Sequence, residues 1–217
     1  MNDLSRKLAQ LLLLGDTMNS YKLVEDLLFE GFTTLNIYEN VIRDAMYYIG
    51  YLCKIDEISV ADEHLATGTA DYVLTKLQFR LEQEKQQSER KKLAIVFCVE
   101  GEEHFLGAKM AASLFKEHGW DVRYLGPNLP LQHAIFYANK SKPDMICISV
   151  TVSHNLKLLP EYLHALESLD QNFTILIGSR LSEKYNLEKF LTNRTKIVRD
   201  LSEMTSIITN EVAHSLR

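Results

Sequence analysis

The sequence predicts an α/β protein in which a bundle of four helices precedes a doubly wound, five-stranded parallel sheet. Two observations carry this prediction. In residues 1–82, apolar side chains recur at helical spacing and no strong strand pattern is present. After residue 92 the pattern changes to strand, loop and helix, repeated five times, and the strand segments are near-continuous apolar runs. Runs without alternation are typical of strands buried on both faces, as in a parallel sheet covered by helices.

The first half of the chain shows an apolar stripe for each expected helix. The residues of the first three stripes are Leu8, Leu11 and Leu12, then Leu23, Leu27 and Leu28, then Ile37, Val41, Ile42, Met46 and Ile49. A fourth helix is expected to begin at Ser59, which forms a capping box with Asp62. We therefore expect a helical domain over 1–86, a charged linker over 87–92 and a sheet domain over 93–217.

The second half contains five apolar runs, each followed by a helical pattern. The expected strands are 93–99, 121–125, 144–150, 173–178 and 195–198. The expected helices are 105–118, 131–141, 155–169, 182–191 and 201–216. Ligands of doubly wound sheets bind at the carboxyl ends of the strands, so residues that follow the runs are the first candidates for a site.

Composition narrows the class of protein. The formal net charge of -5 and the pI near 5.8 argue against a nucleic-acid-binding surface, and no apolar run is long enough for a membrane-spanning helix. The segment MNDLSRKLAQLLLLGD lacks a small-residue cleavage site, so we expect an amphipathic helix rather than a signal peptide. Cys53, Cys98 and Cys147 form no CxxC pair, which favours a reducing compartment and a cytoplasmic protein.

Residues of unusual chemistry follow three of the expected strands. His104 comes after the first run, and Gly107 opens the helix behind it. The third run ends in the polar stretch 149-SVTVS-153, and the fourth ends in 178-GS-179. Together these segments indicate a slot that is lined by small residues and reached by one imidazole.

These residues resemble the signature of cobalamin-binding domains. Glu102-x-His104-x-x-Gly107 is similar to the E/D-x-H-x-x-G motif of that family. Ser149-Val150-Thr151 is similar to its S-x-L motif, and Gly178-Ser179 to its G-G pair. The resemblance implies a flavodoxin-like sheet domain with cobalamin as cofactor and His104 as the lower axial ligand of cobalt.

The same resemblance assigns roles to the neighbouring side chains. It implies that Glu102 takes the other ring N–H of His104, which fixes the tautomer and raises the basicity of the ligand. It also implies that the nucleotide tail of the cofactor threads beside the sheet. Four residues would leave room for this tail and hydrogen-bond it: Ser149, Thr151, Gly178 and Ser179.

The stretch 57-EISVADEHLAT-67 resembles the helical cap of cobalamin-dependent photoreceptors and transcriptional regulators. This resemblance implies that the cofactor lies between the helical cap and the sheet domain. Photoreceptor caps have Trp where this chain has Cys53, and His where it has Lys54. We expect Glu63 and His64 to be the polar groups that approach the upper face of the cofactor, with Cys53 beside them.

Three functions remain open. The first is a cobalamin-binding sensory or regulatory protein, light-responsive or not, that acts through a separate signalling protein and is itself not an enzyme. The second is a corrinoid carrier for methyl transfer, although carriers usually have D-x-H-D-x-G-K where this chain has EEHFLGAK, with Ala108 in place of Lys. The third is a degenerate module for another tetrapyrrole. We expect the first function, with no direct contact to nucleic acid or membrane. The sequence leaves open whether the protein forms a homo-oligomer.

Overall fold

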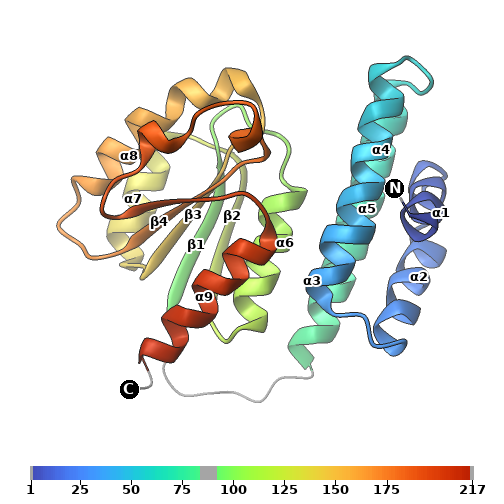
Figure 1. Cartoon of the computed structure of the whole chain (residues 1–217), viewed down its shortest axis with the longest axis horizontal. Coiled ribbons are helices and arrows are strands. Elements are labelled where there is room, and N and C mark those ends of the chain that lie inside the picture. Colours follow the sequence, from blue (N-terminus) through green and yellow to red (C-terminus); the bar gives the residue numbers. More distant parts are fainter. Residues whose placement is uncertain (1, 84–91, 216–217) are drawn as a thin grey trace. The chain divides into compact units, whose positions relative to one another are not determined.

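The computed structural model describes residues 2–83 and 92–215, and the chain divides into two compact units, residues 1–86 and 87–217 (Figure 1). The linker expected over 87–92 lies outside the described residues except for Lys92. No helix in the described ranges is both long enough and apolar enough to cross a membrane.

The first unit contains the four expected helices. Its elements are α1 (Asp3–Leu13), α2 (Thr17–Phe29), α3 (Thr34–Ile37), a π-helical turn (Tyr38–Ile42), α4 (Arg43–Lys54) and α5 (Val60–Gln83). The segment from α3 to α4 is continuous, so it corresponds to one expected helix. The predicted stripes form the core of this unit, where Leu8, Leu12, Leu27, Ile37 and Ile49 are buried.

The start of α5 is fixed by the predicted capping box. The Ser59 hydroxyl accepts the Asp62 N–H at 3.2 Å, and the Asp62 carboxylate accepts the Ser59 N–H at 2.8 Å. These reciprocal bonds satisfy backbone donors that a helix start otherwise leaves without partners.

The π-helical turn in the third helix connects it to the start of α1. A π turn carries one extra residue and displaces a backbone carbonyl from the regular helical ladder. The carbonyl of Asn40 accepts hydrogen bonds from the Ser5 hydroxyl and from the Asn2 side chain, both at 2.9 Å. Asn2 also caps α1 by accepting the Ser5 N–H at 2.8 Å.

The second unit is a five-stranded parallel sheet with the order β2-β1-β3-β4-β5, so the predicted doubly wound, flavodoxin-like fold is confirmed. The strands are β1 (Leu93–Val99), β2 (Asp121–Leu129), β3 (Met145–Ser149), β4 (Thr174–Gly178) and β5 (Thr195–Val198). The helices are α6 (Leu106–Glu117), α7 (Leu131–Ser141), α8 (Leu159–Glu167) and α9 (Leu201–Ser215).

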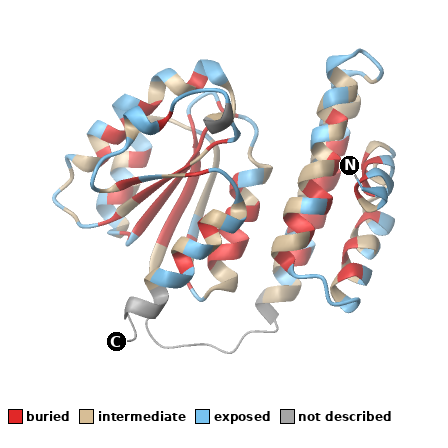
Figure 2. Ribbon diagram, in the orientation of Figure 1, coloured by how far each residue is buried: buried red, intermediate tan, exposed pale blue. Residues whose placement is uncertain are grey.

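Helices cover both faces of this sheet (Figure 1). Helices α6 and α9 pack together on one face, and α7 and α8 pack together on the other. The strands are buried along most of their length (Figure 2), which explains why their sequences are apolar without alternation. On the α7/α8 face, Phe97, Ile148 and Ile177 pack against Tyr162 and Leu166 of α8.

Strand β2 continues four residues beyond its expected end at residue 125. Its pairing with β1 shifts register twice, and Gly126 and Asn128 in this part have positive φ values of 83° and 53°. Glycine and asparagine tolerate this conformation better than other residues. The strand therefore bulges at these residues and still remains paired with β1.

Two expected helices differ in the structure. The prediction of a helix over 182–191 is wrong, because the segment forms short 3-10 turns at Arg180–Glu183 and Glu188–Phe190. The Asn186 side chain accepts the Glu188 N–H at 2.9 Å and so competes with the helical bonding pattern. The helix expected over 155–169 begins as a 3-10 turn at Ser153–Leu158 and becomes α-helical only at Leu159, next to Pro160.

Candidate functional site

A buried carboxylate lies at the carboxyl ends of β1 and β3, where the strand order of the sheet reverses. Glu102 follows β1, and its side chain is fully buried. One of its oxygens, Oε2, accepts the N–H groups of Thr151 and Val152 at 2.7 and 2.9 Å. The other, Oε1, accepts the backbone N–H of His104 at 3.1 Å and lies 2.8 Å from His104 Nδ1. The carboxylate thus connects the loops after the two central strands.

These hydrogen bonds keep Glu102 ionised. Burial raises the pKa of this carboxyl group, but the bonds from the His104 ring and from the N–H groups of Thr151, Val152 and His104 outweigh burial and lower it to about 2. A carboxylate has only acceptor sites, so a negative charge surrounded by donors is the stable state of this group.

The imidazole of His104 is held at one nitrogen and exposed elsewhere. Its side chain is 55% exposed, whereas the Glu102 side chain that contacts it is 0% exposed. A carboxylate at Nδ1 fixes the tautomer that carries the proton on that nitrogen, so that Nε2 becomes the metal-ligating atom. This pair is therefore suited to hold a metal ion by a single histidine.

Two of the small residues expected at the site, Ser149 and Gly178, lie in one row of the sheet, and Thr151 and Ser179 follow the ends of β3 and β4. Ser149 of β3 is paired with Cys98 on one side and with Gly178 on the other. The Cys98 thiol donates to the His104 carbonyl at 4.0 Å, and burial raises its pKa to about 12. Ser179 is buried, and its hydroxyl accepts the Leu181 N–H at 3.2 Å. The predicted slot is thus lined by small side chains whose polar groups are already partly engaged.

Two features of this edge of the sheet leave capacity for a ligand. The hydroxyl oxygen of Thr151 is buried and has no hydrogen-bond partner in the described part of the chain. A Cβ atom placed on Gly107, near the start of α6, would meet nothing within 4 Å. The site therefore offers an unused polar atom in one loop and open space at the helix behind His104.

The remaining predicted residues lie in the helical unit. Cys53 lies half-buried near the end of α4, and burial together with the neighbouring Glu63 raises the pKa of its thiol. His64 lies next to Glu63 in α5 and is exposed. Cys53 and Glu63 thus lie close to each other. The approach of these residues to a cofactor in the second unit stays a prediction.

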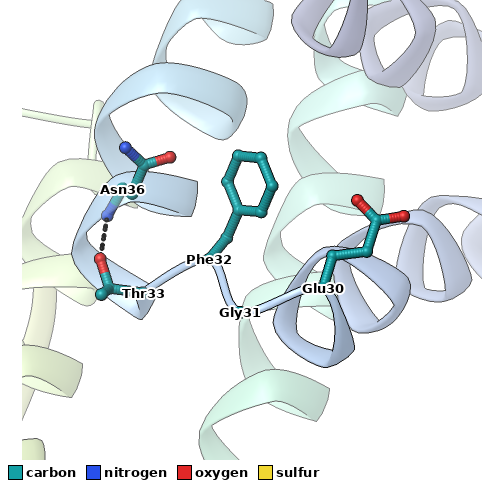
Figure 3. Close-up of a pocket in the computed structure, with 5 residues that line it drawn as sticks. All are labelled: Glu30, Gly31, Phe32, Thr33 and Asn36. Carbon is teal, nitrogen blue, oxygen red and sulfur yellow. Dashed lines mark hydrogen bonds between the residues drawn. The ribbon is translucent and has the colours of Figure 1, made fainter.

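Figure 3 shows a hollow at the turn between α2 and α3, which is lined by Glu30, Gly31, Phe32, Thr33 and Asn36. The Thr33 hydroxyl accepts the Asn36 N–H at 3.1 Å and so caps α3. The hollow contains none of the predicted site residues, and its polar groups serve the start of the helix. We assign it no function.

Three residues that sequence analysis missed support the loop that carries Glu102. Asn128 lies in the bulged end of β2, Asn155 lies in the turn after β3, and Tyr162 comes from α8. Each makes hydrogen bonds to the backbone of residues 100–102. Only Asn128 had a usable sequence signal, because an Asn in the turn-like stretch Gly-Pro-Asn-Leu-Pro favours a positive φ.

Family models agree with the site. The model of the B12 binding domain matches residues 92–187, and a second model with the same description matches residues 4–78. The first match contains all the site residues of the sheet unit, and the second contains those of the helical unit. No curated protein matches the chain in sequence.

Solved structures share the fold of the chain at low sequence identity. The monomethylamine corrinoid protein of Methanosarcina barkeri has a TM-score of 0.76 at 16% identity, over 96% of this chain and 98% of that chain. The methanol:cobalamin methyltransferase complex of the same organism has a TM-score of 0.52 at 15% identity, over 98% and 80%. A cobalamin-binding protein of Desulfitobacterium hafniense has a TM-score of 0.50 at 18% identity, over 96% and 98%. The chain therefore belongs to the cobalamin-binding domain proteins, and its cofactor is cobalamin.

Proposed function

We propose that the protein is a corrinoid carrier, which holds cobalamin through His104 and presents its cobalt to a separate methyltransferase. The observation that carries this proposal is the buried Glu102 carboxylate, which fixes an exposed imidazole where the strand order reverses. The chain itself is then a carrier rather than an enzyme, because its residues bind and orient the cofactor while the partner acts on the methyl group.

The comparisons support the carrier over the sensory protein that the sequence led us to expect. The structural neighbours are named as a corrinoid protein for monomethylamine and as a methanol:cobalamin methyltransferase complex. The first name gives a corrinoid protein and the second a methyltransferase complex, and we extend a role in methyl transfer to this chain as part of the proposal. A sensory role, a response to light and a regulatory partner stay predictions.

The residues present fit cobalamin. The donor set is a histidine with a carboxylate behind it, which is the arrangement that orients metal-binding imidazoles in proteins. The unpartnered Thr151 hydroxyl would provide a hydrogen bond for the tail of the cofactor. The open space at Gly107 leaves room beside the helix for a bulky group.

Each residue has a distinct role in this proposal. Bound cobalamin supplies a cobalt centre that accepts and releases a methyl group. His104 would offer Nε2 to the cobalt, and Glu102 would hold the ring by its Nδ1 proton. Because the pKa of Glu102 is lowered to about 2, its carboxylate stays charged across the physiological pH range and can hold the ring throughout. Ser149 and Gly178 keep side-chain bulk low at the carboxyl ends of β3 and β4, where the tail of the cofactor would lie.

One observation keeps the sensory protein as the second candidate. Carriers usually have Lys at the position of Ala108, and Ala108 is only 2% exposed in α6. A buried alanine cannot take the place of a surface lysine. The chain therefore departs from the carrier pattern at a position where its side chain packs in the interior. The stretch 57–67 adds the resemblance to photoreceptor caps.

Replacing His104 by Ala is expected to remove the lower ligand of cobalt. The purified variant should bind cobalamin at least tenfold more weakly, since a coordination bond stabilises more than the roughly 1.4 kcal/mol that corresponds to a factor of ten. Its visible spectrum should match cobalamin without a histidine ligand. His133→Ala, at an exposed position in α7, is the matched control. Equal spectra and affinities for wild type and His104→Ala would contradict the ligand assignment.

Glu102→Gln is expected to destabilise the sheet unit. Both Glu102 oxygens accept backbone N–H groups, so the amide of Gln would place a donor against a donor in either orientation. We expect a loss of roughly 2 to 4 kcal/mol in the free energy of unfolding, measured by denaturant titration without cofactor. Glu103→Gln changes the exposed neighbour and should leave stability within about 0.5 kcal/mol. A smaller loss for Glu102→Gln would show that the carboxylate does not hold the loops together.

Thr151→Val is expected to separate stability from binding. Valine has the shape of threonine without the hydroxyl, so the change removes a buried group that has no partner. The free energy of unfolding of the apoprotein should therefore stay the same or rise by up to about 1 kcal/mol. Affinity for cobalamin, measured by calorimetry, should fall about fivefold because one hydrogen bond to the cofactor is lost. Thr151→Ser keeps the hydroxyl and serves as control. Unchanged affinity in the valine variant would exclude this contact.

The carrier role predicts methyl transfer from the loaded protein. Protein reconstituted with methylcobalamin should lose its methyl group to a methyltransferase of the same organism faster than free methylcobalamin at equal concentration, as followed by the cobalt spectrum in a single turnover. Since binding to a protein partner brings the cobalt to the transferase, a difference of at least tenfold is expected, equal to about 1.4 kcal/mol. Absence of transfer, together with a change of association state on illumination, would favour the sensory candidate.

A further inference from the structure

The loop between β1 and His104 is held from three directions. Its backbone N–H groups at Glu100 and Gly101 donate to side chains of other elements. Its Gly101 carbonyl accepts from the Asn155 side chain, and its Glu102 carbonyl accepts from the backbone N–H of Asn128. Gly101 has a φ of 75°, a conformation that a glycine adopts without steric cost. Residues 100–102 of the loop are thus each hydrogen-bonded to other elements.

Tyr162 connects this loop to β2. Its hydroxyl accepts the Glu100 N–H at 3.1 Å and donates to the Leu129 carbonyl at 2.5 Å. The side chain is 1% exposed, and its ring lies 6.2 Å from the ring of Phe97 of β1. Burial raises the pKa of Tyr162, so the hydroxyl keeps the proton that it donates. One buried hydroxyl therefore joins the exits of β1 and β2.

Asn128 makes the same connection from the opposite side. Its side-chain oxygen accepts the Gly101 N–H at 2.8 Å, and its own N–H donates to the Glu102 carbonyl at 3.1 Å. Both bonds require the positive φ of Asn128, which aims the side chain and the N–H at the same loop. Asn155 completes the set by donating to the Gly101 carbonyl at 3.2 Å.

We propose that Tyr162 and Asn128 are positioning residues for the cobalt ligand, and that they set how firmly His104 holds the metal. The inference rests on the proposed cobalamin site. His104 follows Glu102 by two residues, and its ring is fixed by the Glu102 carboxylate. A displacement of residues 100–101 is passed to Glu102 through the backbone and from there to the imidazole. The bonds made by Tyr162 and Asn128 oppose that displacement.

A general structural role would lower stability without changing the ligand of cobalt. The distinguishing measurement is the electron paramagnetic resonance spectrum of the protein loaded with cobalt(II) cobalamin. The protein is labelled with histidine carrying the heavy isotope of nitrogen, which splits each cobalt line into a doublet. The cofactor's own benzimidazole, with ordinary nitrogen, gives a triplet, and cobalt without a nitrogen ligand gives neither.

The wild type is expected to show the doublet. In Tyr162→Phe, which keeps the ring on Phe97, the ratio of doublet to unsplit signal should fall about fivefold because the hydroxyl bonds are lost while cobalamin stays bound. Asn128→Gly keeps the backbone conformation and removes only the side-chain acceptor, so it should shift the ratio in the same direction. Tyr137→Phe, which packs against the same core from α7, is the matched control and should keep the wild-type ratio.

The outcomes separate the two proposals. Thermal unfolding of each apoprotein first establishes that it is folded. The two variants lie in different elements, so if one fails to fold, the other still tests the positioning role. A wild-type doublet that persists at equal weight in both variants would overturn the positioning role alone. A triplet or an unsplit signal in the wild type would overturn His104 as ligand, and the positioning role with it.

Discussion

A single buried negative charge organises the carboxyl edge of the sheet. Moving a carboxylate out of water is costly, and Glu102 is stable there only because N–H groups from two loops point at it. The charge therefore determines the path of the chain after β1 and after β3, since both loops must present donors to the same group. The imidazole that the site offers to a metal is placed by this requirement.

The partners of Glu102 also explain why the sequence motifs of the site are imperfect. The carboxylate is held by the backbone N–H groups of residues 151 and 152, which any residue except proline provides. The side chain at position 151 is thus free to differ from the leucine of the family pattern without loosening the site. A change of side chain at position 151 therefore alters contact with the cofactor and leaves the hydrogen bonds to Glu102 in place.

Most of the fold was predictable because burial on both faces leaves an unmistakable pattern in the strands. Residues 93–99 and 195–198 are strands over the expected ranges. The pattern failed where local bonds override it, as in the extension of β2 through Gly126 and Asn128 and in the turn at Asn186. In the site, Glu102 and His104 were found through the resemblance of residues 102–107 to a family motif. Tyr162 was not, because a tyrosine in an apolar helix has no sequence sign that its hydroxyl will meet two loops.

The π-helical turn of the first unit fixes the rotational phase of everything that follows it. One extra residue in a helix turns the downstream side chains by about 100° relative to the upstream ones. Ala45 and Ile49 are buried and Tyr47 and Tyr51 are exposed on the far side of this turn, so the inserted residue decides which of them face the core. A shortening by a single residue there would rotate α4 by about 100° and turn Ala45 and Ile49 away from the core. The hydrogen bond from Ser5 to the Asn40 carbonyl makes that rotation unfavourable, because it ties the insertion to another helix.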